Sequence, residues 1–268
     1  MANDGMEQAR VRVERRAEQQ RTDERERTEG AAKRAAVHRT MALQRHAGFR
    51  RFLFENGLVL AALALFLVSF AGQILTGHAV YNDEQEEHAS PTITLVEYLR
   101  TGDFVEATAE NWESEFLQMA VYVILTVFLF QRGSSESKTI EEPDAVDQRP
   151  EEARGDPDAP GPVRRGGAAL WFYKHSLSLA LLTLFVVSFL AHAVGGSEKF
   201  NQEQQQHGQP QVSMLGYIAT SQFWFESFQN WQSEFMSVGV LVLLSIWLRE
   251  QGSSQSKPVA ASHSDTGE

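Results

Sequence analysis

The pattern Asn-Trp-x-Ser-Glu-Phe occurs twice in the chain, at 111–116 and at 230–235. Its glutamates, Glu115 and Glu234, are acidic in both copies, and each lies at an apolar stretch. A carboxylate at membrane depth is costly and usually faces the helix bundle or a wet cavity. Two such carboxylates held close together would favour the protonated form of at least one, because their charges repel. The pattern therefore predicts an intramembrane polar site for a proton or a cation.

A structural interpretation explains the same pattern without a ligand. Asn111 and Asn230 are suitable N-caps for helices that start there, and a glutamate in the first turn is favoured by the helix dipole. Trp112 and Trp231 are suited to anchor a helix at the outer membrane interface. The serines that complete the predicted polar site are Ser114 and Ser233. Both interpretations stay open on the sequence alone.

A second repeated pattern, Asn-x-Glu-Gln-x-x-His-x-x-Pro, lies in two polar loops. Glu84 and His88 in the first loop, like Glu203 and His207 in the second, are four residues apart and share one face of a helix. This spacing can hold a metal, but each copy supplies only two ligands, so a closed site needs both loops. The alternative is a polar helix that ends at the proline. We expect a polar surface and no bound metal.

The composition excludes several kinds of chemistry. The chain has 268 residues, a net charge of −11 and no cysteine. It therefore has no disulfide, thiolate metal site or cysteine nucleophile. No phosphate loop, nucleophile elbow, zinc-protease motif or dinucleotide fingerprint occurs. The sequence predicts a protein that is not an enzyme, uses no cofactor and, being acidic, does not bind nucleic acid.

Four apolar blocks must position these residues. Two of them, 57–82 and 176–197, exceed the roughly 20 residues that cross a bilayer core of about 30 Å. The other two are shorter and reach spanning length only when extended back to their tryptophans, and the alternative is a soluble bundle with two spans. We expect an all-α membrane protein with spans near 57–78, 110–131, 175–196 and 229–249.

The distribution of Lys and Arg predicts the orientation. Of the 24 such residues, 22 lie in the N-terminal segment, the middle segment and the tail, and only Arg100 and Lys199 lie in the loops after the first and third spans. Positively charged loops stay in the cytoplasm. Both termini should therefore be cytoplasmic, and the two loops should face outward.

The chain also repeats itself without a gap at an offset of 119 residues. Residues 54–138 match 173–257, and 32 of the 85 aligned positions are identical. This is a duplicated two-helix hairpin, and two copies with an even number of spans share one orientation, so a pseudo-two-fold axis along the membrane normal is expected. His192 aligns with Gln73. We expect His192 to make a hydrogen bond between helices.

The domain boundaries follow from the repeat and the flanks. A charged cytoplasmic arm spans 1–50, and we expect a solvated helix, a coiled coil or a disordered segment there. Its bases near Arg45, Arg50 and Arg51 suit contact with anionic lipid. The remaining parts are hairpin repeat 1 at 51–138, a disordered linker at 139–168, hairpin repeat 2 at 169–257 and a disordered tail at 258–268.

The hairpins resemble an uncharacterised family of bacterial integral membrane proteins, a domain of unknown function. The resemblance rests on the segments LFLVSF, NWESEFLQ and FLFQRGSSESK and on their second copies. It covers 52–138 and 172–257. It implies a multi-pass protein of the bacterial inner membrane and no particular activity, so no functional residue can be transferred from it.

Three function classes fit these observations. The first is a non-enzymatic scaffold or interaction protein, which needs no special site. The second is a small proton- or cation-coupled transporter or channel that uses Glu115 and Glu234. The third is a membrane sensor that couples the outer loops to the cytoplasmic arm. The expected partner is the lipid bilayer, and assembly into a homo-oligomer stays open.

Overall fold

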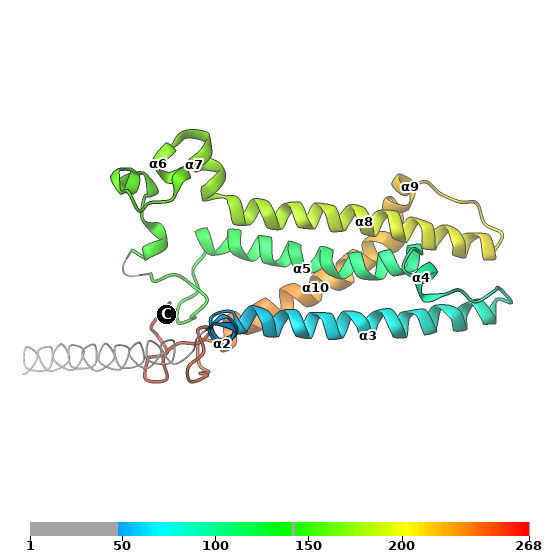
Figure 1. The fold of residues 1–268 in the computed structure, drawn as a ribbon, viewed down its shortest axis with the longest axis horizontal. Helices are drawn as coiled ribbons and strands as arrows, with labels where there is room; N and C mark the ends of the chain where they lie inside the picture. The colour runs from blue at the N-terminus through cyan, green and yellow to red at the C-terminus, as the bar shows by residue number, and fades with distance from the viewer. Residues whose placement is uncertain (1–47, 141–142, 268) are drawn as a thin grey trace, which may run out of the picture. The chain divides into compact units, whose positions relative to one another are not determined.

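The structure is a computed structural model that describes residues 48–140 and 143–267, and within these ranges it is helical with no β-strand (Figure 1). The longer helices are α3 (Gly57–Glu87), α5 (Gly102–Phe128), α8 (Ser176–Gln206) and α10 (Ser221–Leu244). The shorter helices are α2 (Phe49–Glu55), α4 (Leu95–Tyr98), η1 (Ala145–Asp147), η2 (Pro150–Gly155), α6 (Gly161–Arg165), α7 (Gly167–Lys174) and α9 (Met214–Ile218). Two compact units divide the chain between Gln73 and Ile74, inside α3.

Two of the four expected spans, α3 and α8, are long and apolar enough to cross a membrane. Each has 31 residues, or about 46 Å at 1.5 Å per residue. The search of the described residues finds only these two, because α5 and α10 are polar through their first halves. The charged arm before residue 48 lies outside the described residues.

Helices α5 and α10 begin eight residues before the positions expected from the sequence. Thr101 and Thr220 are the N-caps, and their hydroxyls accept hydrogen bonds from the amides of Phe104 and Phe223, both at 3.3 Å. The prediction that asparagine caps these helices was therefore wrong. Threonine satisfies the free amides of the first turn two to three turns earlier, which places the Asn-Trp-x-Ser-Glu-Phe pattern inside each helix.

The connection between α3 and α4 and the connection between α8 and α9 are built alike. The side chain of Asn82 both donates to the carbonyl of Ile93 (3.1 Å) and accepts from its amide (2.8 Å). Asn201 makes the same pair of bonds with Val212, at 2.9 and 2.8 Å. The asparagine of the repeated loop pattern therefore fixes the loop to its helix, which explains its presence in both copies without a ligand.

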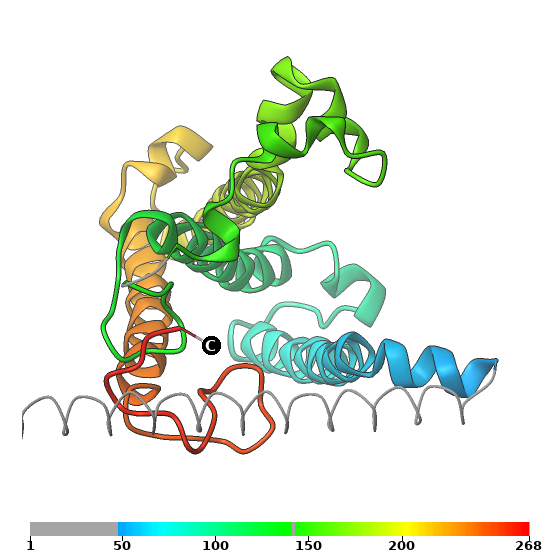
Figure 2. The same ribbon diagram turned by 90° about the vertical axis from the view of Figure 1, so that its left-hand side faces the viewer.

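Helices α5 and α8, one from each copy, pack along each other within the second unit, and α10 packs on α5 (Figure 2). Their backbones touch at Gly102 and Gly195. A Cβ at Gly195 would lie 2.6 Å from the amide nitrogen of Glu106 and 2.8 Å from the carbonyl oxygen of Gly102. Only glycine permits this close approach, which brings the polar face of α5 against α8.

The segment expected to be a disordered linker contains short helices in the structure. Pro150 and Pro162 occupy the first turns of η2 and α6, where the missing amide costs nothing. Ala159, Val163 and Leu170 form a small buried cluster that joins this segment to α7. Apolar residues at the end of an otherwise polar stretch thus give it a core that composition does not reveal.

The two Gly-Ser-Ser-x-Ser-Lys loops, which follow α5 and α10, have the same hydrogen bonds. Ser137 accepts from the amide of Gln131 at 3.0 Å, and Ser256 accepts from the amide of Glu250 at 2.9 Å. Lys257, the buried last residue of the second loop, donates to the carbonyl of Asp265 in the expected tail at 2.8 Å. The tail is therefore attached to the second loop, where the sequence predicted disorder.

A buried histidine between two carboxylates

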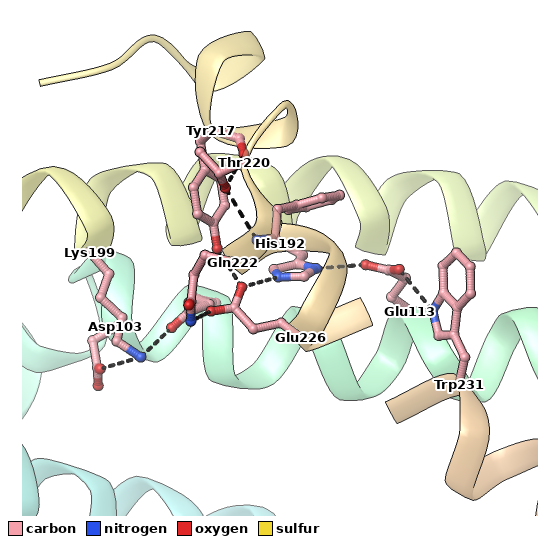
Figure 3. A network of polar contacts seen from close by, with 11 residues as sticks. Asp103, Glu113, His192, Lys199, Tyr217, Thr220, Gln222, Glu226 and Trp231 are labelled. Atoms are coloured by element: carbon pink, nitrogen blue, oxygen red, sulfur yellow. Dashed lines mark hydrogen bonds and ion pairs between the residues drawn. The ribbon is translucent and has the colours of Figure 1, made fainter. Parts of the chain in front are cut away.

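His192 of α8 lies at the centre of a buried polar cluster, with both ring nitrogens facing carboxylates of other helices (Figure 3). Its Nδ1 lies 2.7 Å from Oε2 of Glu113 on α5, and its Nε2 lies 3.4 Å from Oε2 of Glu226 on α10. The side chains of His192 and Glu113 have no exposed surface. The expected interhelical hydrogen bond of His192 is confirmed, and it joins three helices.

Neutral side chains donate further hydrogen bonds to both carboxylates, and the Tyr217 hydroxyl donates to the same Glu226 oxygen that faces His192. Trp231 Nε1 donates to Glu113 at 3.1 Å. Tyr217 of α9 donates to Glu226 at 2.5 Å, and Gln222 donates to its other oxygen at 2.6 Å. Burial, and then the neighbouring Glu226, raise the pKa of the Tyr217 hydroxyl above its ordinary value, so this hydroxyl stays a donor.

These contacts determine where the proton of the cluster lies. A neutral imidazole has one N–H donor and one acceptor nitrogen, whereas two ionised carboxylates both require donors. Trp231, Tyr217 and Gln222 each donate to a carboxylate oxygen of Glu113 or Glu226, so these oxygens act as acceptors. The geometry therefore fits an imidazolium at His192 between two carboxylates, a site that holds one proton more than neutral histidine.

A second ion-pair group lies closer to the C-terminal end of α8 and the N-terminal end of α5. Lys199 of α8 contacts Glu106 at 2.7 Å and Asp103 at 3.7 Å, both on α5 (Figure 3). Glu110, between this group and Glu113 along α5, interacts electrostatically with His192. The four acids of this helix are spaced three or four residues apart, so they share one face of α5. They are Asp103, Glu106, Glu110 and Glu113. That face is the one packed against α8.

The glutamates singled out by the sequence pattern lie elsewhere. Glu115 is exposed on α5, and Glu234 on α10 is half-buried. Glu115 acts electrostatically on Glu234, but no hydrogen bond joins the two within the described ranges. The fully buried acid of the pattern is Glu113, two residues before Glu115.

The other members of the predicted site make bonds within their own helices. Asn111 donates to the carbonyl of Ala107 at 2.7 Å. Ser114, which is buried, donates to the carbonyl of Asn111 at 2.8 Å, and Ser233 makes the equivalent bond to Asn230 at 2.8 Å.

The two tryptophans of the pattern differ in their surroundings. Trp112 is exposed, and its role as a membrane-interface anchor stays a prediction. Trp231 is half-buried and donates to Glu113. The aligned positions thus serve different purposes in the two copies.

The outer-loop residues form no metal centre in the part of the chain that is described. No group of three or more His, Asp or Glu side chains suitable for a metal occurs there. Glu84, Glu203 and His207 are exposed, and His88 bonds through Nδ1 to the carbonyl of Glu84 at 2.8 Å.

The comparison of the two repeat copies did not indicate the buried cluster, because its residues differ between the copies. Glu113, His192 and Glu226 align with Gln232, Gln73 and Ala107. Positions shared by both copies direct attention to Glu115 and Glu234 instead. The sequence feature that could have indicated the cluster is a difference between the copies: α5 and α8 carry titratable residues where the aligned position of the other copy is uncharged.

The fold and the cluster define the class of this protein: an all-helical chain, over its described residues, with two helices able to cross a membrane and a buried charged site between helices. The chain belongs to the family described as a domain of unknown function (DUF6766), whose model matches residues 49–268. The expected membership of an uncharacterised family is confirmed. No curated protein and no solved structure matches the chain.

Proposed function

We propose that this protein translocates protons across the bacterial inner membrane through the His192 cluster. The observation that carries the proposal is that both ring nitrogens of a fully buried histidine face carboxylates from two other helices. Chains of Asp, Glu and His inside membrane helices are the usual components of proton relays. The function is non-enzymatic, because no covalent step is involved.

The proposal includes a four-span topology of two tandem hairpins. Helices α5 and α10 have 27 and 24 residues, or about 40 and 36 Å, which is enough to cross a bilayer. On the polar face of α5, Glu106 and Glu113 are buried against α8, so these charges avoid lipid, whereas Glu115 lies exposed elsewhere on the helix. The Lys and Arg distribution supports cytoplasmic termini and a cytoplasmic linker.

His192 lies within membrane depth in this arrangement. It is 16 residues beyond the start of α8 at Ser176, or about 24 Å along the helix from its cytoplasmic end. Lys199 lies two turns further out and is 38% exposed. The cluster is thus nearer to the outer surface, and the Lys199 group lies between it and that surface.

Release of the proton changes the contacts between helices. Loss of the Nε2 proton leaves a lone pair of His192 facing the Glu226 carboxylate, and the two repel. At 3.4 Å this contact is the longer of the two, so it separates while the Nδ1–H bond to Glu113 holds. Proton release therefore weakens the attachment of α10 to α8, which couples the charge of the site to helix packing.

The scaffold interpretation accounts less well for the buried charges. Burying an ion pair costs desolvation that well-packed apolar residues avoid. The chain itself has uncharged alternatives at the aligned positions, Gln73 and Gln232. A protein that only needs packed helices has no use for the charged versions, whereas a proton relay requires them.

Proton flux into liposomes tests the proposal. The protein is reconstituted with an internal pH dye, and a potassium diffusion potential drives protons inward. We expect acidification with the unaltered chain and a return to the rate of protein-free liposomes for His192→Gln, which installs the residue of the first copy. Glu115→Gln is the matched control and should conduct normally, because Glu115 is exposed. Flux equal to that of empty liposomes, or full flux in a folded His192→Gln variant, would overturn the proposal.

A further inference from the structure

Three adjacent aromatic side chains on helix α7 are exposed on the surface of the molecule. A pair of arginines on helix α6 lies near them in the sequence. Trp171, Phe172 and Tyr173 are 52%, 59% and 47% exposed. Arg164 and Arg165, at the end of α6, are also exposed. We call these five residues the pre-span surface, because α7 ends at Lys174, two residues before α8 begins.

The pre-span surface is held in place from behind. Leu170 of α7 and Val163 of α6 are 3% and 6% exposed and pack together with Ala159. The rings of Trp171 and Phe172 meet edge to face at 5.0 Å. The aromatic residues are therefore exposed on a packed element, and contiguous exposed apolar surface of this kind marks an interaction site.

The position and charge of this surface identify what covers it. A helix able to cross a membrane starts immediately after α7, so the aromatic side chains lie where the bilayer interface meets that helix. Trp and Tyr prefer this level of the membrane. Arg164 and Arg165 have no ion-pair partner in the described part of the chain, and bases at this level attract anionic headgroups.

We propose that the pre-span surface binds anionic phospholipid of the cytoplasmic leaflet, with the arginines on the headgroup and the aromatic rings at the acyl boundary. The acids of the preceding segment are partly neutralised, since Glu151 pairs with Lys174 at 3.4 Å. The inference requires insertion of α8 in a membrane and does not depend on proton binding by His192.

The first copy carries the same arrangement independently. Helix α2, which ends two residues before α3, has exposed Phe52 and Phe54 at the positions aligned with Trp171 and Tyr173. It also contains exposed Arg50 and Arg51. Both membrane-length helices are thus preceded by a short helix with exposed aromatic and basic side chains, although the bases occupy different positions in the two copies.

Lipid-selective quenching tests the inference in the full chain. The protein has no cysteine, so a single Ala168→Cys on α7 carries a fluorescent dye one turn before Phe172. The labelled protein is placed in phosphatidylcholine vesicles containing a minority of phosphatidylglycerol. Two samples are compared. In one, phosphatidylglycerol carries bromine on its acyl chains, and in the other an equal mole fraction of the lipid is brominated phosphatidylcholine.

We expect brominated phosphatidylglycerol to quench the dye more than brominated phosphatidylcholine does. This excess should disappear in Arg164→Gln/Arg165→Gln and persist in the control Arg149→Gln, an exposed base outside the surface. Equal quenching by both lipids, or an excess that survives the double substitution, would contradict lipid selectivity. Weak quenching by both would show that the surface does not lie at the acyl boundary, and it too would overturn the inference. Proton flux is measured on the same vesicles, so failure here is separable from failure of the proposed function.

Discussion

Glu113 is the acid whose removal should disturb the protein most. It is fully buried and bonds to both His192 and Trp231. Glu113→Gln should lower the free energy of unfolding by about 3 kcal/mol, because a buried charge loses its partner. His192→Gln should cost a similar amount, and the double variant less than the sum, with a coupling of about 1–3 kcal/mol.

The free energy of unfolding of each single variant and of the double variant, measured in mixed micelles, gives this coupling. Glu115→Gln is the control, and a change below about 0.5 kcal/mol is expected for an exposed side chain. Strict additivity of Glu113→Gln and His192→Gln would show that the two side chains do not interact as the structure indicates.

At this scale the sequence predicted the interhelical bond of His192, but the acids it singled out are not the ones that surround this histidine. It predicted a carboxylate inside the membrane and a histidine bonded between helices, and His192 makes that bond. It could not select Glu113 over Glu115, because the choice depends on which side of α5 faces α8. Rotation by two residues moves a side chain to the other face of a helix, and no periodicity argument fixed that rotation.

Among the elements, the pairing of α5 with α8 depends on glycine at their crossing. Gly195→Ala places a methyl group 2.6 Å from a backbone nitrogen of α5, so the helices must separate. We expect a loss of about 2 kcal/mol or more in the free energy of unfolding, together with reduced proton flux as Glu113 moves away from His192.

Gly239→Ala is the matched control on α10, where a Cβ meets nothing within 4 Å. It should be neutral or slightly stabilising, because alanine favours the helix. Thermal unfolding in the same detergent compares the two. A Gly195→Ala variant as stable as Gly239→Ala would show that the close crossing is not needed.

The elements themselves were predictable to different degrees. Helices α3 and α8 were expected because their apolar runs are uninterrupted and exceed the bilayer thickness. The start of α5 was misplaced by eight residues, since the polar turn between Gly102 and Asn111 looks like loop until Thr101 is recognised as its cap. Short helices in the linker were missed because three buried residues are too few to show a period.

For the whole molecule, the 22 to 2 distribution of Lys and Arg predicts the topology. Single cysteines at Ser90 or Gln209 should react with an impermeant reagent added outside intact cells, because both positions follow the outer ends of membrane-length helices. A cysteine at Asp147 should react only after the membrane is opened. The reverse pattern would contradict the orientation, and labelling of all three from outside would contradict the four spans.

The central claim is that His192 holds an exchangeable proton inside the membrane, and nitrogen NMR of the histidine ring tests it most directly. Protein with labelled histidine is placed in bilayers, and the signal absent from His192→Gln is assigned to His192. The account predicts an imidazolium signal at neutral pH that converts to the neutral form only as the pH is raised further, and that converts at a lower pH in Glu113→Gln, because one of the two carboxylates that favour the charged ring is lost. A His192 signal that stays neutral throughout, or one that Glu113→Gln leaves unmoved, would contradict it.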